Sequence, residues 1–215
     1  MTNKLAKQKE MINILELIVT LTLVSGTYQN KKDNMTLVQN YEIATLGSGC
    51  FWCTEAVFEG VKGVISAESG YSGGFVKNPS YREVCNGSTG HAEVVQVRFN
   101  PSIITYNEIL EIFFVSHDPT SLNKQGADVG TQYRSVIFYH NVKQKAIAEQ
   151  FIKELTEKAV YDKPVVTQLV EFTAFYVAEK YHQDYFANNP NEAYCSYVIR
   201  PKLEKFRIKY SDMLK

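Results

Sequence analysis

The order of strand and helix patterns between residues 42 and 139 constrains the fold of this chain more than any other sequence feature. Residues 92–99 show the strongest single pattern. Val95, Val97 and Phe99 alternate there with polar residues, as in a strand with one buried face. Further strand patterns cover residues 42–46, 64–71 and 133–139, and helical spacing of apolar residues covers residues 51–59 and 101–115. The order β-α-β-β-α-β matches the split βαβ arrangement of ferredoxin-like folds.

The segments after residue 139 extend this core without changing its class. A helix is expected over residues 142–160, a strand over 165–170, short helices over 179–187 and 202–214, and loops over 75–90 and 118–131. We therefore predict an α+β fold with a ferredoxin-like split βαβ core, one mixed sheet, helices packed mainly on one side, and an irregular C-terminal segment. Such a fold carries many unrelated functions, so the function must be argued from the site.

The composition excludes several classes of protein. The 215 residues include 23 Lys and Arg and 23 Asp and Glu, so the formal net charge is zero and no basic footprint for nucleic acid is expected. Apolar residues make up 45% and charged residues 21%, which is typical of a folded globular chain and not of a disordered one. We expect one folded domain over residues 41–215.

Residues 1–40 form an N-terminal extension of different composition. Three lysines precede an apolar run over residues 11–25, and a polar linker follows over residues 28–39. The run is interpreted either as a signal peptide or as an amphipathic extension, so the compartment stays open between cytoplasmic and exported. It is short for a spanning helix, and no stable membrane span is expected in the domain over residues 41–215.

The chain has four cysteines, which are Cys50, Cys53, Cys85 and Cys195. Four in a chain of this length are too few for a disulfide scaffold. Taken alone, Cys85 and Cys195 are best interpreted as small buried residues. The pair Cys50 and Cys53 is treated separately, because a Cys-x-x-Cys spacing is typical of redox and metal sites.

Cys50 and Cys53 lie at the junction between a predicted strand and a predicted helix. The free N–H groups and the dipole of a helix N-terminus favour an anion, so we expect a lowered pKa for the Cys50 thiol. Cys53 lies one helical turn further on, within reach of the Cys50 sulfur. Phe51 and Trp52 place an apolar wall beside this sulfur, which suits a small group such as a methyl thioether.

A zinc site and a dithiol exchange site are the alternatives to a nucleophilic cysteine. A zinc site needs two more ligands at compact spacing, but Cys85 and His91 form no second close pair in the sequence, so we predict no metal. A thiol–disulfide oxidoreductase of the thioredoxin type remains open.

Downstream motifs distinguish between a nucleophile and a dithiol exchange site. They are residues 49–52 (GCFW), 70–74 (GYSGG), 78–85 (NPSYREVC), 90–93 (GHAE), 117–120 (HDPT), 125–135 (QGADVGTQYRS), 182–185 (HQDY) and 189–190 (NP). In this order they closely resemble the peptide methionine sulfoxide reductase type A family over residues 42–197. Each motif is short, and the specificity comes from their joint order.

The resemblance implies a role for each matched residue. Cys50 is the expected nucleophile, Phe51 and Trp52 hold the sulfoxide methyl group, Glu93 protonates the sulfoxide oxygen, Tyr81 and Tyr133 donate hydrogen bonds to that oxygen, and Asp128 orients the substrate. The chemistry agrees, because a sulfoxide oxygen leaves only after protonation and an apolar setting keeps a carboxylic acid protonated. We assign His91, His117 and His182 to structural hydrogen bonding.

The chain departs from the family pattern at its resolving cysteine. Many members carry Gly where this chain has Cys53, and in the Cys variant the second cysteine resembles a resolving residue. Cys195 resembles another resolving position, but Ala193 replaces the usual Gly nearby and a different tail covers residues 196–215. We therefore favour Cys53 as the resolving residue, with Cys195 as the second candidate.

The resemblance implies reduction of methionine-S-sulfoxide, protein-bound or free, in the repair of oxidative damage. The implied cycle passes through a sulfenic acid and an intramolecular disulfide, and thioredoxin regenerates the dithiol. No cofactor is implied, since no phosphate-cradling glycine motif is present. The expected partners are the oxidised substrate and thioredoxin, and the protein is expected to act as a monomer.

Overall fold

A computed structural model describes residues 41–215, and strand β3 (Ala92–Phe99) lies at the centre of its main sheet. On its two sides β3 pairs antiparallel with β1 (Glu42–Ser48) and β2 (Val64–Ser72). The sheet order is β7-β6-β1-β3-β2-β8, where the other strands are β6 (Ser135–Tyr139), β7 (Gln168–Glu171) and β8 (Phe175–Val177). β7 runs parallel to β6, whereas the other pairs are antiparallel, so the predicted mixed sheet is confirmed.

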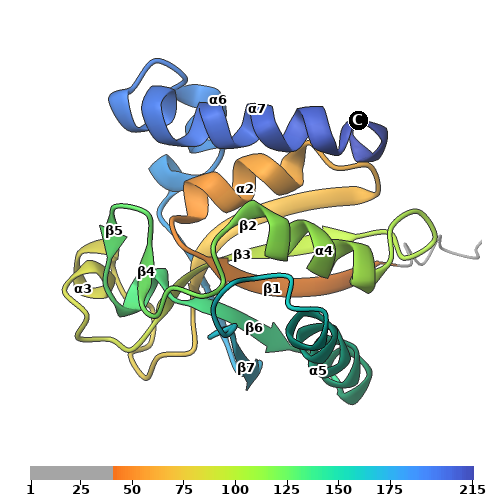
Figure 1. Cartoon of the computed structure of the whole chain (residues 1–215). Helices are drawn as coiled ribbons and strands as arrows, with labels where there is room; N and C mark the ends of the chain where they lie inside the picture. Colours follow the sequence, from red (N-terminus) through yellow and green to blue (C-terminus); the bar gives the residue numbers. More distant parts are fainter. Residues whose placement is uncertain (1–40) are drawn as a thin grey trace, which may run out of the picture. The chain divides into compact units, whose positions relative to one another are not determined.

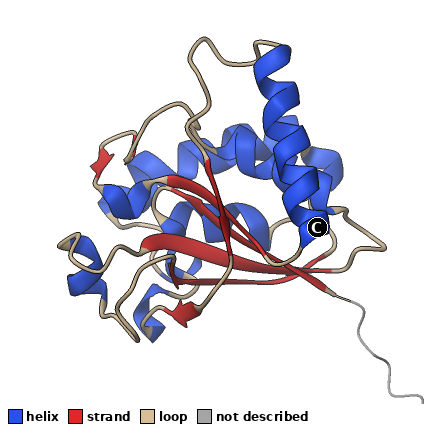
Figure 2. Ribbon diagram, turned by 90° about the horizontal axis from the view of Figure 1, so that it is seen from below, coloured by secondary structure: helices blue, strands red, loops and turns tan. Residues whose placement is uncertain are grey.

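The four inner strands and two helices form the predicted split βαβ core. Helix α2 (Phe51–Glu59) connects β1 to β2, and α4 (Tyr106–Ser116) follows β3. Figure 1 shows α2 and α4 on the same side of the sheet, with α7 (Arg200–Lys209) across α2. Helix α5 (Val142–Glu157) contacts α4 and strands β6 and β7. The view from below in Figure 2 shows that the opposite face of the sheet carries mainly loops.

The alternation along β3 divides the apolar residues between two clusters. Val95, Val97 and Phe99 belong to the main core under the helices, whereas Val94 and Ala92 belong to a small cluster on the other face. Because neighbouring side chains of a strand point to opposite faces, Glu93 lies on the helix-covered face. The alternation along β3 therefore directs the carboxyl group of Glu93 into the main core, below the start of α2.

Several local predictions differ from the structure. The segment predicted as a loop over residues 75–90 contains helix α3 (Tyr81–Cys85), which begins with a capping box between Ser80 and Glu83. The Ser-x-x-Glu signal for it is visible in the sequence. The helix predicted from residue 101 begins at residue 106, because a second capping box joins Thr105 to Glu108.

The remaining differences concern short elements that local patterns specify weakly. The predicted loop over residues 118–131 contains a small hairpin of β4 (Lys124–Gln125) and β5 (Asp128–Val129), and edge strand β8 was not predicted. The helix predicted over residues 179–187 divides into a 3₁₀ turn (Lys180–His182) and α6 (Tyr185–Asn188). A π-helical turn (Cys195–Ile199) precedes α7, which ends at Lys209, and a 3₁₀ turn (Ser211–Met213) follows.

Within residues 41–215, no helix has both the length and the apolar character needed to cross a membrane. The predicted signal peptide or amphipathic extension lies outside the described residues.

Phe58, on the buried face of α2, is one of the largest fully buried side chains of the core. We expect Phe58→Ala to lower the free energy of unfolding by about 3–5 kcal/mol, because it removes buried apolar surface and leaves a cavity. Phe75 is 80% exposed, so Phe75→Ala is the matched control and should stay within about 0.5 kcal/mol of the parent. Urea denaturation of both variants measures the difference, and equal effects would contradict this account of the core.

Candidate active site

The turn between β1 and α2 sets the position of Cys50. Gly49 has a φ of +95°, and a Cβ atom there would lie 2.6 Å from the side chain of Gln125, so the turn requires glycine. Cys50 is the N-cap residue of α2, and its carbonyl oxygen accepts a hydrogen bond from the Cys53 N–H at 3.1 Å. The predicted position of Cys50 at a helix N-terminus is thus confirmed.

The expected lowering of the Cys50 pKa is wrong. The residue is only 8% exposed, and burial raises the pKa of its thiol well above the usual value. Its hydrogen bond to Cys53 and the charge of Glu93 act in the same direction, whereas the Trp52 N–H favours the thiolate. Desolvation therefore outweighs the helix terminus, and the resting Cys50 keeps its proton.

Cys53 is the sulfur whose pKa is lowered. It is partly buried one turn into α2, and the hydrogen bond from Cys50 lowers its pKa more than burial raises it. The positive charge of Lys202 acts in the same direction. The pKa values of the two thiols therefore shift in opposite directions, and Cys53 has the more acidic thiol of the pair.

Glu93 connects strand β3 to the start of helix α2. The Phe51 N–H donates a hydrogen bond to Oε2 of Glu93 at 3.1 Å. Oε1 is buried and has no hydrogen-bond partner among the described residues. Burial raises the pKa of this carboxyl group to about 8, so it is mainly protonated at neutral pH. Oε1 is the oxygen free to carry that proton to a bound group.

The two predicted aromatic residues differ in exposure. Phe51 is 1% exposed and contacts the rings of Tyr81 and His182 at centroid distances of 6.3 and 5.0 Å. Trp52 is partly buried and stacks on Tyr185, with ring centroids 3.7 Å apart. Phe51 is therefore the buried support of the site, while Trp52 keeps exposed ring surface.

The two predicted phenols lie near the same carboxyl group. Tyr81 begins α3, Tyr133 ends a 3₁₀ turn (Thr131–Tyr133), and both are partly buried. Burial raises the pKa of both phenols, and the charge of Glu93 adds to both shifts. They therefore stay neutral and can donate hydrogen bonds to an oxygen beside Glu93.

Two residues that hold this site were not predicted from the sequence. Glu179 accepts hydrogen bonds from the Tyr81 N–H and the Tyr71 hydroxyl, both at 2.8 Å. Tyr194 donates its hydroxyl proton to Oδ2 of Asp128 at 2.6 Å. Glu179 follows β8 and Tyr194 precedes Cys195, so both come from the segment whose local patterns are weakest. The one sequence feature that pointed to Tyr194 is its position next to Cys195.

The remaining cysteines have different surroundings. Cys195 is fully buried in the π-helical turn, where burial raises the pKa of its thiol and the charge of Cys53 adds to the shift. Cys85 is partly buried, and burial also raises its pKa, although a hydrogen bond with Tyr81 acts against this. All four cysteines are free thiols in this structure. Cys85 thus contacts a predicted site residue, which its interpretation as a packing residue did not anticipate.

The comparisons with known proteins agree with this geometry. The family model described as "Peptide methionine sulfoxide reductase" matches residues 42–214. The chain belongs to this family. It is 60% identical to the peptide methionine sulfoxide reductase MsrA of Sulfolobus acidocaldarius, over 80% of this chain and 96% of the relative. It is 53% identical to the corresponding protein of Thermus thermophilus, over 81% of this chain and 98% of that relative.

Solved structures show the same family likeness. Mxr1 from Saccharomyces cerevisiae in reduced form has a TM-score of 0.66 and 36% identity, covering 73% of this chain and 90% of that chain. Methionine sulfoxide reductase A of Corynebacterium diphtheriae has a TM-score of 0.63 and 32% identity, covering 70% and 76%. The likeness to these solved structures thereby confirms the α+β fold that the element order predicts for this chain.

The three histidines of the family motifs make structural hydrogen bonds. His91 accepts from the Gly74 N–H at 3.0 Å, and His117 lies 2.7 Å from both the Phe113 carbonyl oxygen and the Ser135 hydroxyl. His182 accepts from the Trp52 indole N–H on Nδ1 at 3.1 Å. The proton of neutral His182 is therefore on Nε2, and Trp52 depends on this tautomer for its orientation.

Replacing Glu93 by Gln tests whether its proton is used. The amide keeps the size of the side chain but cannot release a proton, so we expect single-turnover reduction at pH 7 to slow by about 10²–10⁴-fold. With a pKa of about 8, Glu93 is about nine-tenths protonated at pH 7 and about one-tenth at pH 9. The ratio of parent to variant rate should therefore fall about tenfold over this range.

Rapid-quench measurement of both proteins at each pH gives this ratio. A ratio that does not change between pH 7 and pH 9 would contradict the assignment of Glu93 as the acid.

The single tryptophan makes the contact with His182 observable. Because burial lowers the pKa of His182, the ring gains a proton on Nδ1 only as the pH falls below about 6.5, and the Trp52 N–H then loses its acceptor. We expect a change of Trp52 fluorescence in this acid range and its absence in His182→Phe. His140→Phe is the control, since His140 bonds Thr45 instead. An acid transition that survives in His182→Phe would refute this coupling.

Proposed function

We propose that residues 41–215 form one catalytic domain that reduces methionine-S-sulfoxide, protein-bound or free, to methionine. The observation that carries this proposal is Glu93, a buried acid with a pKa of about 8 and an unpartnered oxygen, hydrogen-bonded to the residue after Cys50. A group that must accept a proton before it leaves, such as a sulfoxide oxygen, requires an acid that is still protonated at neutral pH.

In the first step the nucleophile and the acid act on the same substrate group. Cys50 attacks the sulfoxide sulfur while Glu93 gives its proton to the oxygen, and Tyr81 and Tyr133 donate hydrogen bonds as charge develops there. The new bond between the two sulfurs and the substrate S–O bond then break, the hydroxyl group ends on Cys50 as a sulfenic acid, and methionine leaves with the electron pair. The substrate is thereby reduced by two electrons and Cys50 is oxidised by two. The partly exposed face of Trp52 contacts the methyl group, with Phe51 behind it, and Asp128 orients the substrate.

The hydrogen bond between the two sulfurs supports a role for Cys53 in this step. Cys50 is protonated at rest, so its proton must leave before or during the attack. Cys53 has the more acidic thiol of the pair, and its interaction with Cys50 is the largest cause of that lowered pKa. We infer that Cys53 accepts the proton of Cys50.

The second part of the cycle restores the thiols. Cys53 attacks the Cys50 sulfenic acid, water leaves, and a disulfide forms. Cys195 is the second candidate for this step, but its complete burial favours Cys53. Thioredoxin then reduces the disulfide by thiol exchange. Mxr1, the yeast protein whose reduced form is similar to this chain, has also been solved in complex with Trx2.

Serine variants separate the two cysteine roles. We expect Cys50→Ser to abolish reduction, since it removes the nucleophile. Cys53→Ser should reduce at most one equivalent of substrate and then stop with thioredoxin, because no disulfide forms. Methionine formed per enzyme is measured by chromatography, with Cys195→Ser as the matched control that keeps full turnover. Multiple turnover by Cys53→Ser would transfer the resolving role to Cys195.

The assay with pure sulfoxide epimers tests the reaction class itself. An NADPH-coupled assay should consume the S epimer of a methyl sulfoxide and leave the R epimer unchanged. A protein that reduces disulfides of insulin but neither epimer would be a thioredoxin-like oxidoreductase instead.

A further inference from the structure

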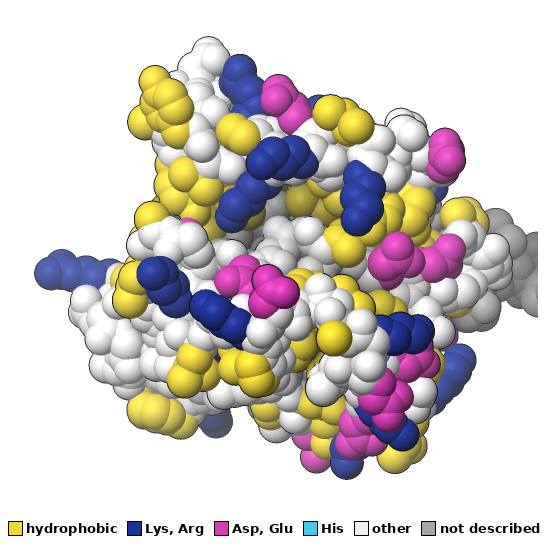
Figure 3. All heavy atoms as spheres, viewed as in Figure 1, with side chains coloured by type: hydrophobic (Ala, Val, Ile, Leu, Met, Phe, Trp, Pro, Cys, Tyr) yellow, Lys and Arg dark blue, Asp and Glu magenta, His cyan; other side chains and the backbone are white. Residues whose placement is uncertain are grey.

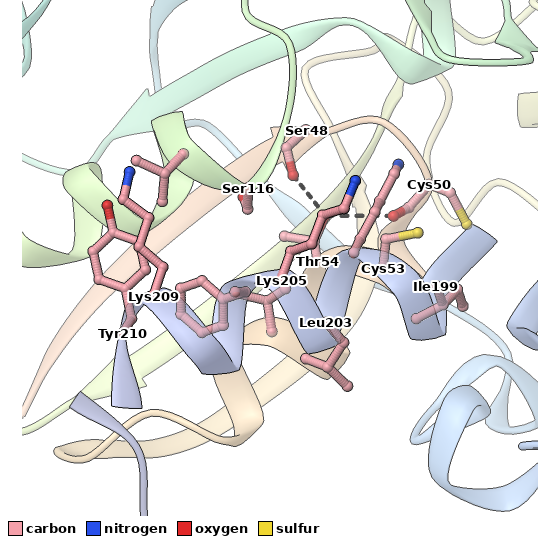
Figure 4. A pocket seen from close by; sticks show the side chains of 14 residues that line it. Ser48, Cys50, Cys53, Thr54, Ser116, Ile199, Leu203, Lys205, Lys209 and Tyr210 are labelled. Atoms are coloured by element: carbon pink, nitrogen blue, oxygen red, sulfur yellow. Dashed lines mark hydrogen bonds between the residues drawn. The ribbon is translucent and has the colours of Figure 1, made fainter. Parts of the chain in front are cut away.

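A groove of about 200 Å³ opens beside the two cysteines, between α2, the end of α4 and α7. Its apolar lining includes Val57, Val115, Leu203 and Phe206. Cys50 and Cys53 lie at one end of it, and Lys209 and Tyr210 at the other (Figure 4). The groove is thus a hollow along α7 that leads to the redox pair.

The groove does not include the residues assigned to the sulfoxide. Phe51, Trp52, Tyr81, Glu93 and Tyr133 are all absent from its lining. The redox pair therefore borders two separate regions, one with the acid and the phenols and the other with this groove. A ligand in the groove meets the sulfurs but none of the groups that would handle a sulfoxide oxygen.

Three lysines give the groove a positive rim. Lys202, Lys205 and Lys209 follow the spacing of one helical face, and all three line the groove, whose lining holds no acidic residue. None of them forms an ion pair within residues 41–215. Figure 3 shows basic side chains gathered along α7 above a hollow in the surface. Because the whole chain has zero net charge, these lysines form a local positive patch. This patch attracts an anionic partner.

We propose that this groove is the docking surface of the protein reductant, a dithiol protein whose attacking thiolate is surrounded by apolar and acidic residues. This inference rests on the proposed function, because only a recycling enzyme needs such a partner. An apolar lining with a lysine rim complements that surface, and the positive potential attracts the incoming thiolate.

The exchange chemistry agrees with the exposure of the two sulfurs. Cys53 is the less buried sulfur of the pair, so the partner's thiolate attacks it and forms a mixed disulfide, while Cys50 leaves as a thiolate and takes a proton. The partner's second thiolate then attacks the partner's first sulfur in the mixed disulfide. This forms the partner's disulfide and releases Cys53 as a thiolate. Two electrons pass from the dithiol to the oxidised pair, and the partner becomes a disulfide.

Charge reversal on α7 tests the docking surface. We choose Lys205→Glu with Lys209→Glu, because both side chains are exposed, and leave Lys202 in place because its charge lowers the Cys53 pKa. The measured quantity is kcat/KM for a thioredoxin divided by the turnover rate with dithiothreitol. We expect this ratio to fall at least about tenfold, and its dependence on salt to become weaker than in the parent.

The matched control is Lys143→Glu with Lys153→Glu on α5, which makes the same charge change on two exposed lysines away from the groove. The control should keep the ratio within about twofold of the parent, as expected of surface changes away from an interface. An equal fall in both double variants would mean that overall charge, not the groove, attracts the reductant, and would overturn the proposal.

Two further outcomes would also overturn it. Parallel losses with thioredoxin and dithiothreitol would assign the lysines to folding or chemistry. A higher KM for a sulfoxide-containing protein, with unchanged thioredoxin kinetics, would make the groove a substrate site. Failure of the proposed function itself is distinguishable, because the parent protein would then reduce no sulfoxide even with dithiothreitol.

Discussion

The hydrogen bond from the Phe51 N–H to the Glu93 carboxyl group is the contact on which the rest of the site depends. It joins the central strand β3 to the first turn of α2, and so holds the Glu93 carboxyl group beside Cys50, the proposed nucleophile. Burial of this contact has two consequences. It keeps Glu93 protonated at neutral pH, and it keeps the proton on Cys50 as well. The acid is thereby ready, whereas the nucleophile must still be deprotonated.

Helix α2 separates the two halves of the proposed cycle. Its first turn carries Cys50 and Phe51 beside the acid and the phenols, while both Cys50 and Cys53 border the groove beside α7. The same helical turn thus places the pair of sulfurs between two regions of different chemistry. Such separation allows a substrate and a reductant to be recognised by different chemistry, apolar and proton-donating on one side and cationic on the other.

Particular residues show which features of the site can be predicted from local sequence patterns and which cannot. The alternation along β3 puts Glu93 on the face of Val95 and Val97, and the glycines before Cys50 mark the turn that ends β1. Glu179 and Tyr194 were missed because their partners, Tyr81 and Asp128, lie far away in the sequence. The Cys50 pKa was predicted in the wrong direction because a helix terminus is a local property, whereas desolvation depends on everything packed around the thiol.

From the sequence alone follow the α+β class, the split βαβ core, the family and the residues of the candidate site, because strand and helix periods and motif order are written in neighbouring positions. The charge states of those residues, the hydrogen bonds that orient them and the lysine-rimmed groove depend on the folded chain. Each of them arises where segments from distant parts of the sequence exclude water together, and the free energy of a charge depends on that exclusion.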